Sequence, residues 1–219
     1  MSWMAVPSET TLLYSQIGLR LVDEFTGGPL AHPVEAHLSF QDAAGNWQRL
    51  EVNPVPTPAG HLLYPGLGRS ANAGVAPMVR HRVRIESDFY RPEYLRTVDA
   101  LEFDVHPYDD ATPPVVVPTL PTTVLLLPSP IYPFAGFMRT VRGRTLDSLG
   151  DPLPNVEVTL GTTERALSDQ RGVFALPLRW AAFTGGIVLD AIDHRTGRTD
   201  QISLTLPQDL LQGHAFTLT

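Results

Sequence analysis

Hydrophobic and polar residues alternate in short runs along most of the chain, and turn residues separate the runs. In residues 34–40, VEAHLSF, the apolar side chains fall on one face and Glu, His and Ser fall on the other. The same alternation marks residues 17–22, 47–52 and 80–87, and in the last of these it places Arg80, Arg82 and Arg84 on one face. A period of two residues is typical of half-buried β-strands. We therefore expect an all-β protein.

The first half of the chain predicts one β-sandwich. Residues 34–40 and 47–52 flank the turn residues QDAAGN and predict a hairpin. A further strand at 94–105 completes a set of roughly seven short strands, which is the number and spacing of a sandwich. We place this first domain at 17–105, after an N-terminal arm at 1–16.

A proline-rich segment follows the first domain. Eight prolines lie between residues 106 and 134. Proline fixes φ and lacks an N–H donor, so the segment is expected to be extended and stiff rather than part of a central sheet. Its apolar runs, 115–118 and 122–128, are either edge strands of the first domain or a strap laid against it. We assign residues 106–137 to this linker.

The second half, residues 138–219, predicts another set of short strands. Residues 185–206 predict a hairpin whose turn is DHRTGR, residues 207–213 predict one helical turn, and residues 214–219 predict a last strand. Pro and Gly separate these segments, as expected for a second β-sandwich domain.

Three blocks of the first half recur, in order, in the second. The first two lie within GGPLAHPVEAHL, which resembles GDPLPNVEVTL, and the second of them pairs Val34, Glu35 and Leu38 with Val156, Glu157 and Leu160. The third is GHLLYP, which resembles GVFALP. Duplication explains this order better than chance, although turn chemistry common to all β-sandwiches is the rival explanation. The paired residues of the first block are Gly27 and Gly150, Pro29 and Pro152, and Leu30 and Leu153.

The second copy resembles the carboxypeptidase regulatory-like domain, a β-sandwich of the transthyretin-like type. That family has the pattern V-x-G-x-V-x-D, then G-x-P-L-x-G-V-x-V, then T-D-x-x-G-x-F/Y-x-L. Asn155 stands in place of the usual Gly, and asparagine tolerates the left-handed backbone conformation that such a glycine adopts. Ser168 stands in place of Thr. The matching residues are Val141, Gly143, Asp147, Gly150, Pro152, Leu153, Val156, Val158, Asp169, Gly172, Phe174 and Leu176.

This resemblance covers residues 138–219 and extends to 17–104 only through the repeat. It implies two tandem transthyretin-like or Ig-like β-sandwich domains joined by the proline-rich extended segment. The motif residues suit turns and core positions, so the resemblance indicates the fold and not a task.

Composition removes several classes of function. The formal charge is −7, with 23 acidic and 16 basic residues, which disfavours nucleic acid and anionic lipid as partners. The chain has no cysteine, and all of its basic residues other than histidine are arginine, so thiol, disulfide and lysine Schiff-base chemistry are excluded. No secretion signal or membrane-spanning run is evident, so we expect a cytoplasmic protein.

The candidate chemistry is sparse. The seven histidines are scattered and form no H-x-H or H-E-x-x-H motif. Asp104, Asp109 and Asp110 are weak candidates for a Ca²⁺ site, against the simpler interpretation of an acidic loop. We therefore predict no catalytic residues, no cofactor and no bound metal.

Three functional hypotheses follow. The first is a non-catalytic structural or protein–protein interaction protein, in a larger assembly or homo-oligomer, such as an accessory component of a phage tail or contractile injection apparatus. The second is a carbohydrate- or peptide-binding module with Trp47, Tyr90 and Tyr94 on its ligand face. The third is a metal-dependent enzyme that uses residues 94–110.

Overall fold

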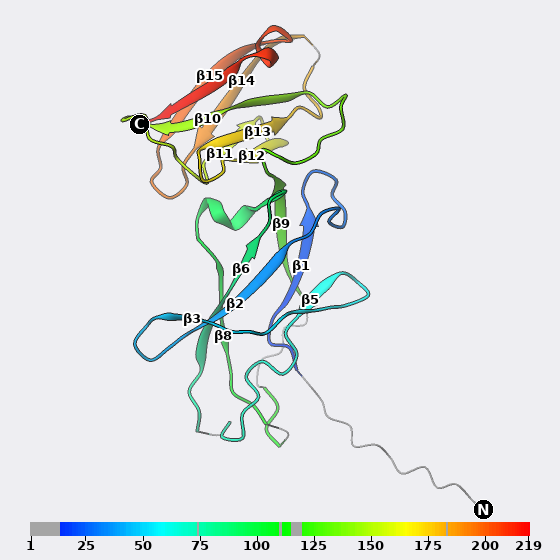
Figure 1. Ribbon diagram of the computed structural model, residues 1–219, viewed down its shortest axis with the longest axis vertical. Coiled ribbons are helices and arrows are strands. Elements are labelled where there is room, and N and C mark those ends of the chain that lie inside the picture. The colour runs from blue at the N-terminus through cyan, green and yellow to red at the C-terminus, as the bar shows by residue number, and fades with distance from the viewer. Residues whose placement is uncertain (1–13, 74, 110, 115–119, 183) are drawn as a thin grey trace, which may run out of the picture. The chain divides into compact units, whose positions relative to one another are not determined.

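The protein is represented by a computed structural model that describes residues 14–73, 75–109, 111–114, 120–182 and 184–219. Regular structure in these ranges is almost entirely β (Figure 1). Two short 3-10 turns accompany the strands there, η1 (Glu93–Arg96) and η2 (Gln208–Leu211). The predicted all-β class is confirmed, and η2 is the predicted single helical turn.

The described chain divides into two compact units, and the division passes through strands rather than between them. Unit 1 contains the described residues of Met1–Arg20, Leu38–Arg82 and Glu102–Thr122. Unit 2 contains the described residues of Leu21–His37, Val83–Leu101 and Thr123–Thr219. The domain limits expected from the sequence remain a prediction.

Short antiparallel pairs build unit 1. Strand β1 (Gly18–Asp23) pairs with β5 (His61–Leu63), and β5 pairs with β4 (Val55–Pro56). Strand β2 (Glu35–Gln41) forms the predicted hairpin with β3 (Trp47–Arg49), which is shorter than the sequence indicated. The strand order of the second sheet is β3-β2-β6-β8.

The strand predicted at 94–105 is wrong in its first half. Strand β6 (Val79–Glu86) lies beside β8 in the sheet, but β8 comprises only Leu101–Val105. The backbone N–H groups of Thr97 and Val98 both donate to the carbonyl of Tyr94, which closes the turn η1 instead. Local turn hydrogen bonds there replace ladder hydrogen bonds.

Tyrosine and leucine side chains fill the core of unit 1. Leu19, Leu38, Tyr64 and Tyr108 are fully buried. Gln16 ties the first strand to the segment after β8, because its amide accepts the N–H of His106 at 2.8 Å and donates to the same residue's carbonyl at 2.6 Å.

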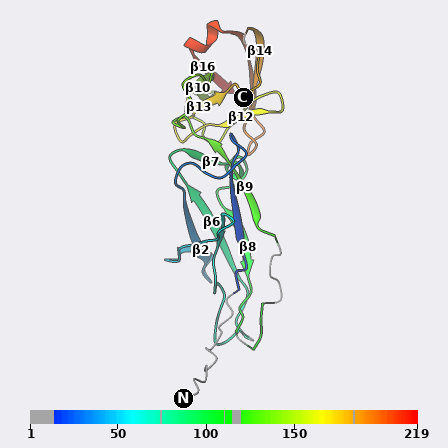
Figure 2. The same ribbon diagram turned by 90° about the vertical axis from the view of Figure 1, so that its right-hand side faces the viewer.

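The proline-rich segment contains an interior strand, which corrects the prediction that it stays outside the central sheet. Strand β9 (Thr122–Pro128) lies between β1 and β7 (Tyr90–Pro92) in the order β4-β5-β1-β9-β7. Figure 2 labels both β7 and β9. Pro121 precedes the strand and Pro128 ends it, so its interior keeps every N–H donor. Leu126 and Leu127 are fully buried in unit 2.

Unit 2 also contains a sandwich formed by residues 140–218. One sheet has the order β13-β10-β16, and the other has the order β12-β11-β14-β15. The last strand runs parallel to the first of the sandwich, with Phe216 beside Thr145. The strands are β10 (Thr140–Asp147), β11 (Glu157–Leu160), β12 (Glu164–Leu167), β13 (Val173–Pro177), β14 (Gly185–Ile192), β15 (Thr199–Leu206) and β16 (Gly213–Leu218).

Both sheets contribute to one apolar core. Val141, Phe174 and Phe216 come from the first sheet, and Val158 and Leu189 come from the second. All five are fully buried. The alternating residues that predicted strands here are the residues that face this core.

The motif residues serve backbone geometry. Gly150 and Gly172 have φ of 87° and 69°, and Asn155 has φ of 61°, as its tolerance of the left-handed region predicted. The Asp169 carboxylate accepts the N–H groups of Arg171 and Val173 at 2.8 and 2.9 Å, which fixes the turn before β13. These residues therefore stabilise the turns of the fold.

Candidate functional site

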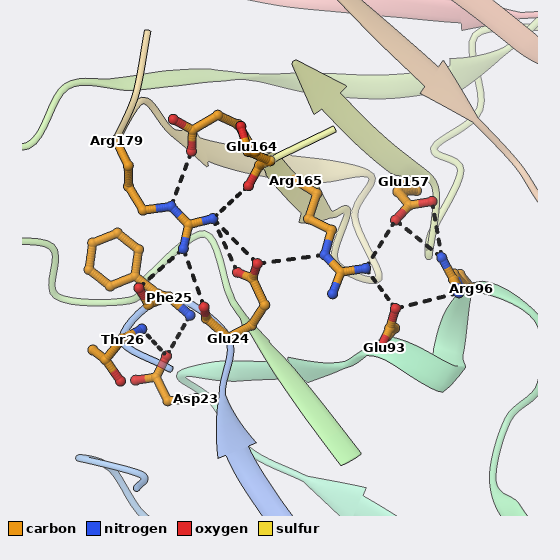
Figure 3. A network of polar contacts seen from close by, with 11 residues as sticks. Asp23, Glu24, Phe25, Thr26, Glu93, Arg96, Glu157, Glu164, Arg165 and Arg179 are labelled. Carbon is orange, nitrogen blue, oxygen red and sulfur yellow. Dashed lines mark hydrogen bonds and ion pairs between the residues drawn. The ribbon is translucent and has the colours of Figure 1, made fainter. Parts of the chain in front are cut away.

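Seven charged side chains of unit 2 form a connected group, here called the ion-pair cluster (Figure 3). Four are glutamates and three are arginines, and they come from the turn after β1, from η1, from β11 and β12, and from the segment after β13. The members are Glu24, Glu93, Arg96, Glu157, Glu164, Arg165 and Arg179.

Arg179 anchors one end of the ion-pair cluster. Its Nε donates to Glu164 at 3.1 Å, and its Nη2 lies 3.3 Å from the carboxylate of Glu24. The remaining donors reach the carbonyls of Glu24, Phe25 and Thr163 at 2.9–3.2 Å. Every nitrogen of this guanidinium is therefore satisfied, which a charge that is only 13% exposed requires.

Arg165 occupies the middle of the cluster. Its Nη1 lies 2.6 Å from Glu93, and its Nε lies 3.6 Å from Glu24. Burial lowers the pKa of Arg165, but the hydrogen bond and charge of Glu93 outweigh burial and raise that pKa overall. The guanidinium is thus held charged by its neighbours.

Glu157 anchors the other end. Its carboxylate is 9% exposed, lies 3.4 Å from Arg96 and lies 2.5 Å from Nε2 of His194. Next to it, Arg195 pairs with Asp99 at 2.9 Å and donates to the carbonyl of Leu95 at 2.7 Å. The cluster therefore joins the 93–99 region to both the β11–β12 hairpin and the β14–β15 turn.

Beside the cluster, one fully buried carboxylate organises two aromatic side chains. Oδ2 of Asp23 accepts the hydroxyls of Tyr90 and Tyr132 at 3.1 and 3.0 Å. Its Oδ1 accepts the N–H groups of Phe25 and Thr26. Burial is the largest cause that raises the pKa of both tyrosines, and the hydrogen bond and charge of Asp23 raise it further.

A pocket of about 390 Å³ opens near these groups in unit 2. Its wall includes two of the three predicted ligand-face residues, Tyr90 and Tyr94. The Tyr90 hydroxyl is already used by Asp23, whereas Tyr94 faces the pocket with two arginines. We call it the donor pocket, and it is lined mainly by Arg84, Glu86, Tyr90, Arg91, Tyr94, Leu95, Asp99, Asn155 and Gln170.

The third predicted ligand-face residue has a different environment. Trp47 lies on β3 in unit 1 and is half-buried, and the guanidinium of Arg82 lies 4.3 Å from the centre of its ring. This is a cation–π contact. The ligand face predicted from the sequence is therefore divided between the two units.

The predicted metal candidates are not seen as one group. Asp104, on β8, has its carboxylate 4.0 Å from Arg80, and Asp109 accepts the N–H groups of Ala111 and Thr112 in a turn. Asp110 lies outside the described residues. Among those that are described, no three His, Cys, Asp or Glu side chains gather as metal ligands would.

Sequence reasoning missed the ion-pair cluster and, in the donor pocket, Arg91. Glu93 and Arg165 are far apart in the chain, and each is unremarkable in its own segment. The alternation of its strand predicts that the Arg165 side chain lies on the polar face. It does not predict which carboxylate pairs with that side chain. The alternation of Arg80, Arg82 and Arg84 did reveal an arginine-bearing face, on which Arg80 pairs with Glu102 at 2.8 Å.

Two aspartates cover sheet edges in the C-terminal sandwich. The N–H of Thr205, on edge strand β15, donates to Asp209 at 2.6 Å. The N–H of Thr217, on edge strand β16, donates to Asp200 at 2.7 Å. Carboxylates thus occupy donors that an added strand would need, so partner binding by strand addition is opposed here.

Comparison with known proteins identifies no family. No family model matches the chain, and no curated protein matches it. The TIE protein of Bacillus anthracis is 12% identical with a TM-score of 0.29, over 94% of this chain and 34% of that one. A streptococcal ancillary pilin is 15% identical with a TM-score of 0.31, over 96% of this chain and 64% of that one.

The chain therefore spans about a third of the first protein and less than two thirds of the second. At these TM-scores the two neighbours assign neither a family nor a function. Within the described ranges, no helix is long and apolar enough to cross a membrane.

Proposed function

We propose that this protein is a non-catalytic structural or protein-interaction component. In the proposed organisation, two tandem β-sandwich domains, 17–105 and 138–219, are joined by the segment 106–137. The observation that carries the proposal is the ion-pair cluster. In this cluster, charged side chains of unit 2 form ion pairs with one another and hydrogen bonds with backbone groups.

The geometry of the cluster suits a rigid connection between the segments that carry it. Glu164 is 2% exposed and accepts both Arg179 and the N–H of Trp180. Buried ion pairs add little net stability, but removing one partner is costly, so they favour a single arrangement of the segments that carry them. The turn 23–26 and η1 are thereby fixed against β11 and β12.

The narrower proposal is an accessory component of a particle assembled in the cytoplasm, such as a phage tail or contractile injection apparatus. The absence of cysteine supports it, because such a scaffold folds without disulfides. The motif residues also support this proposal, because they form turns and pack in the core rather than forming a catalytic site.

Co-purification tests this proposal. The tagged chain, expressed at its natural level in its own cells, is expected to sediment with a large complex and to retain defined partners. The Arg165→Gln variant should fold but enter the complex less well, while Arg171→Gln, at a side chain that is 73% exposed, should enter normally. A wild-type chain found only as a free monomer would contradict the proposal.

A second candidate is the peptide-binding module, which the donor pocket favours. The enzyme hypothesis is tested by metal analysis of the purified protein. Stoichiometric iron, zinc or calcium would replace the structural proposal with a metal-dependent one.

A further inference from the structure

We propose that the donor pocket binds a carboxylate side chain on an acidic peptide segment of a partner protein. The inference rests on the proposed interaction function for the nature of the partner, and it names the chemistry by which that partner is recognised. The pocket is small for a ligand site, because such sites span roughly 300–1,000 Å³. It therefore suits a few residues rather than a long segment.

The first argument is the distribution of charge. The two acids of the wall already have basic neighbours, since Glu86 lies 3.5 Å from His37 and Asp99 lies 2.9 Å from Arg195. The two arginines of the wall, Arg84 and Arg91, have no carboxylate at ion-pair distance among the described residues. The pocket therefore holds two guanidiniums without an ion-pair partner, in a chain whose net charge is −7.

The second argument is the supply of free donors. The Tyr94 hydroxyl oxygen accepts the N–H of Ile85 at 2.9 Å, and its own proton meets no acceptor in the described part of the chain. Arg91 donates to the side-chain carbonyl of Asn155, which leaves the Asn155 amide protons available. Guanidinium, phenol and amide donors thus line one pocket, and an anionic oxygen is the complementary group.

The third argument is proximity. Arg84, Arg91 and Tyr94 line the same pocket. Burial and the charge of Glu86 raise the pKa of the Tyr94 phenol, and the charges of Arg84 and Arg91 lower it, so both arginines lie near this side chain. Nε of Arg91 is buried without an acceptor, the only such side-chain atom found in the described residues. Burial lowers the pKa of Arg91, and the charges of Asp169 and Tyr94 oppose this without outweighing it. Asp169 is already paired with Arg171. An incoming carboxylate supplies the missing countercharge.

A carboxylate fits this set better than a neutral sugar. Arginine binds carboxylates through paired, charge-assisted hydrogen bonds, which are about twice as strong as neutral ones. The net negative charge of the chain opposes an acidic peptide only at long range, because salt screens it within about 8 Å at physiological ionic strength. Recognition is therefore local and weakens as salt is added.

The test compares two peptides that differ only in charge. Fluorescence anisotropy at low salt measures binding of a labelled Gly-Glu-Glu-Gly peptide, blocked at both ends, and of its Gly-Gln-Gln-Gly counterpart. We expect the acidic peptide to bind at least about tenfold more tightly, and Arg84→Gln and Arg91→Gln each to weaken it by about five- to tenfold. Tyr94→Phe should weaken it less.

Arg144→Gln is the matched control, because Arg144 is exposed on β10 and lies outside the pocket. It removes the same charge and should leave binding unchanged. Arg84 is itself exposed, so its variant tests the pocket even if Arg91→Gln fails to fold. Equal binding of both peptides, or equal weakening by Arg84→Gln and Arg144→Gln, would overturn the inference.

Free glutamate that binds as tightly as the acidic peptide would also overturn it, in favour of a small-molecule site. The result is separable from the proposed function. Peptide binding by a chain that never joins a complex rejects the assembly role alone. A complex that forms normally with Arg84→Gln, together with a peptide that does not bind, rejects the pocket alone.

Discussion

The guanidinium of Arg179 donates through Nε to the buried carboxylate of Glu164 at 3.1 Å. Glu164 is on β12 and Arg179 follows β13, so the pair joins neighbouring segments of one sandwich. The same carboxylate accepts the N–H of Trp180 at 2.5 Å. One side chain therefore accepts hydrogen bonds from both the guanidinium of Arg179 and the backbone N–H of Trp180.

Replacing Glu164 by Gln is expected to destabilise the protein strongly. The variant keeps the shape of the side chain but leaves Arg179 with Glu24 as its remaining carboxylate. Removing one member of a buried pair costs about 3–5 kcal/mol, and the partial exposure of Arg179 places this case near 3 kcal/mol. Urea unfolding followed by circular dichroism measures the difference.

Arg171→Gln provides the exposed comparison. Arg171 pairs with Asp169 at 3.0 Å, but its side chain is 73% exposed. Exposed pairs contribute less than about 1 kcal/mol. If both variants lost the same stability, the buried cluster would have no special role.

Asp23→Asn should be more damaging than Tyr132→Phe. The carboxylate of Asp23 accepts hydrogen bonds from four N–H and O–H donors. In the asparagine variant, an NH2 group replaces one of the two oxygens, so two of these donors would face another donor. We expect a loss of about 2–3 kcal/mol, against about 1 kcal/mol for the loss of the single Tyr132 hydroxyl. Thermal unfolding of both variants gives the order, and a larger loss in Tyr132→Phe would contradict this account.

Local pattern was sufficient to predict most strands. The hairpin of β14 and β15, the 3-10 turn after it and the left-handed Asn155 follow from alternation and turn chemistry, and the structure confirms them. The prediction that excluded strand β9 from the central sheet was wrong. It extended the effect of the prolines at the ends of the strand to the residues between them, which keep their N–H donors. Which strands become neighbours depends on long-range packing that no single segment encodes.

The candidate site was predictable only in part. Tyr90 and Tyr94 were predicted from the sequence as ligand-face residues, and both line the donor pocket. Asn155 and Gln170 reach the same pocket from turns more than sixty residues further along the chain, so no local pattern could have paired them with Arg91. The sequence also does not show which charged side chains have an ion-pair partner. The pairing of Asp99 with Arg195, for example, follows only from the fold.

Gly143→Ala should disrupt the sandwich, although Gly143 needs no left-handed backbone. A Cβ there would lie 2.4 Å from the carbonyl oxygen of His214 and 2.7 Å from the ring of Phe174. Both neighbours belong to packed strands of the same sheet, so we expect a loss of at least about 2 kcal/mol from overpacking. Gly213→Ala, which meets nothing within 4 Å, should be neutral or slightly stabilising.

Asp200→Ala should expose the edge of β16. Its carboxylate accepts the N–H of Thr217, so losing it should speed hydrogen exchange at Thr217 by about tenfold, which corresponds to about 1.4 kcal/mol. An uncovered edge should also increase concentration-dependent self-association in sedimentation experiments. Asp151→Ala removes a charge from an exposed position and should change neither measurement, while unchanged exchange at Thr217 in Asp200→Ala would argue against edge protection.

Ionisation of Tyr64 should lower the free energy of unfolding in alkaline solution. Burial raises the pKa of Tyr64 from 10.0 to about 12, and the side chain is fully buried in unit 1. Between those pH values the unfolded chain loses the phenol proton while the folded chain keeps it, so stability falls as the pH rises. The stability that Tyr64 supplies is complete below pH 10 and declines by about 2 kcal/mol at pH 12.

Tyr64→Phe isolates this effect from those of Tyr90 and Tyr132, whose pKa values burial also raises. The difference in unfolding free energy between wild type and Tyr64→Phe should be constant from pH 7 to about pH 9. It should then shift by about 2 kcal/mol in favour of the variant as the pH approaches 12. A difference that stayed constant across the whole range would show that Tyr64 ionises equally in both states.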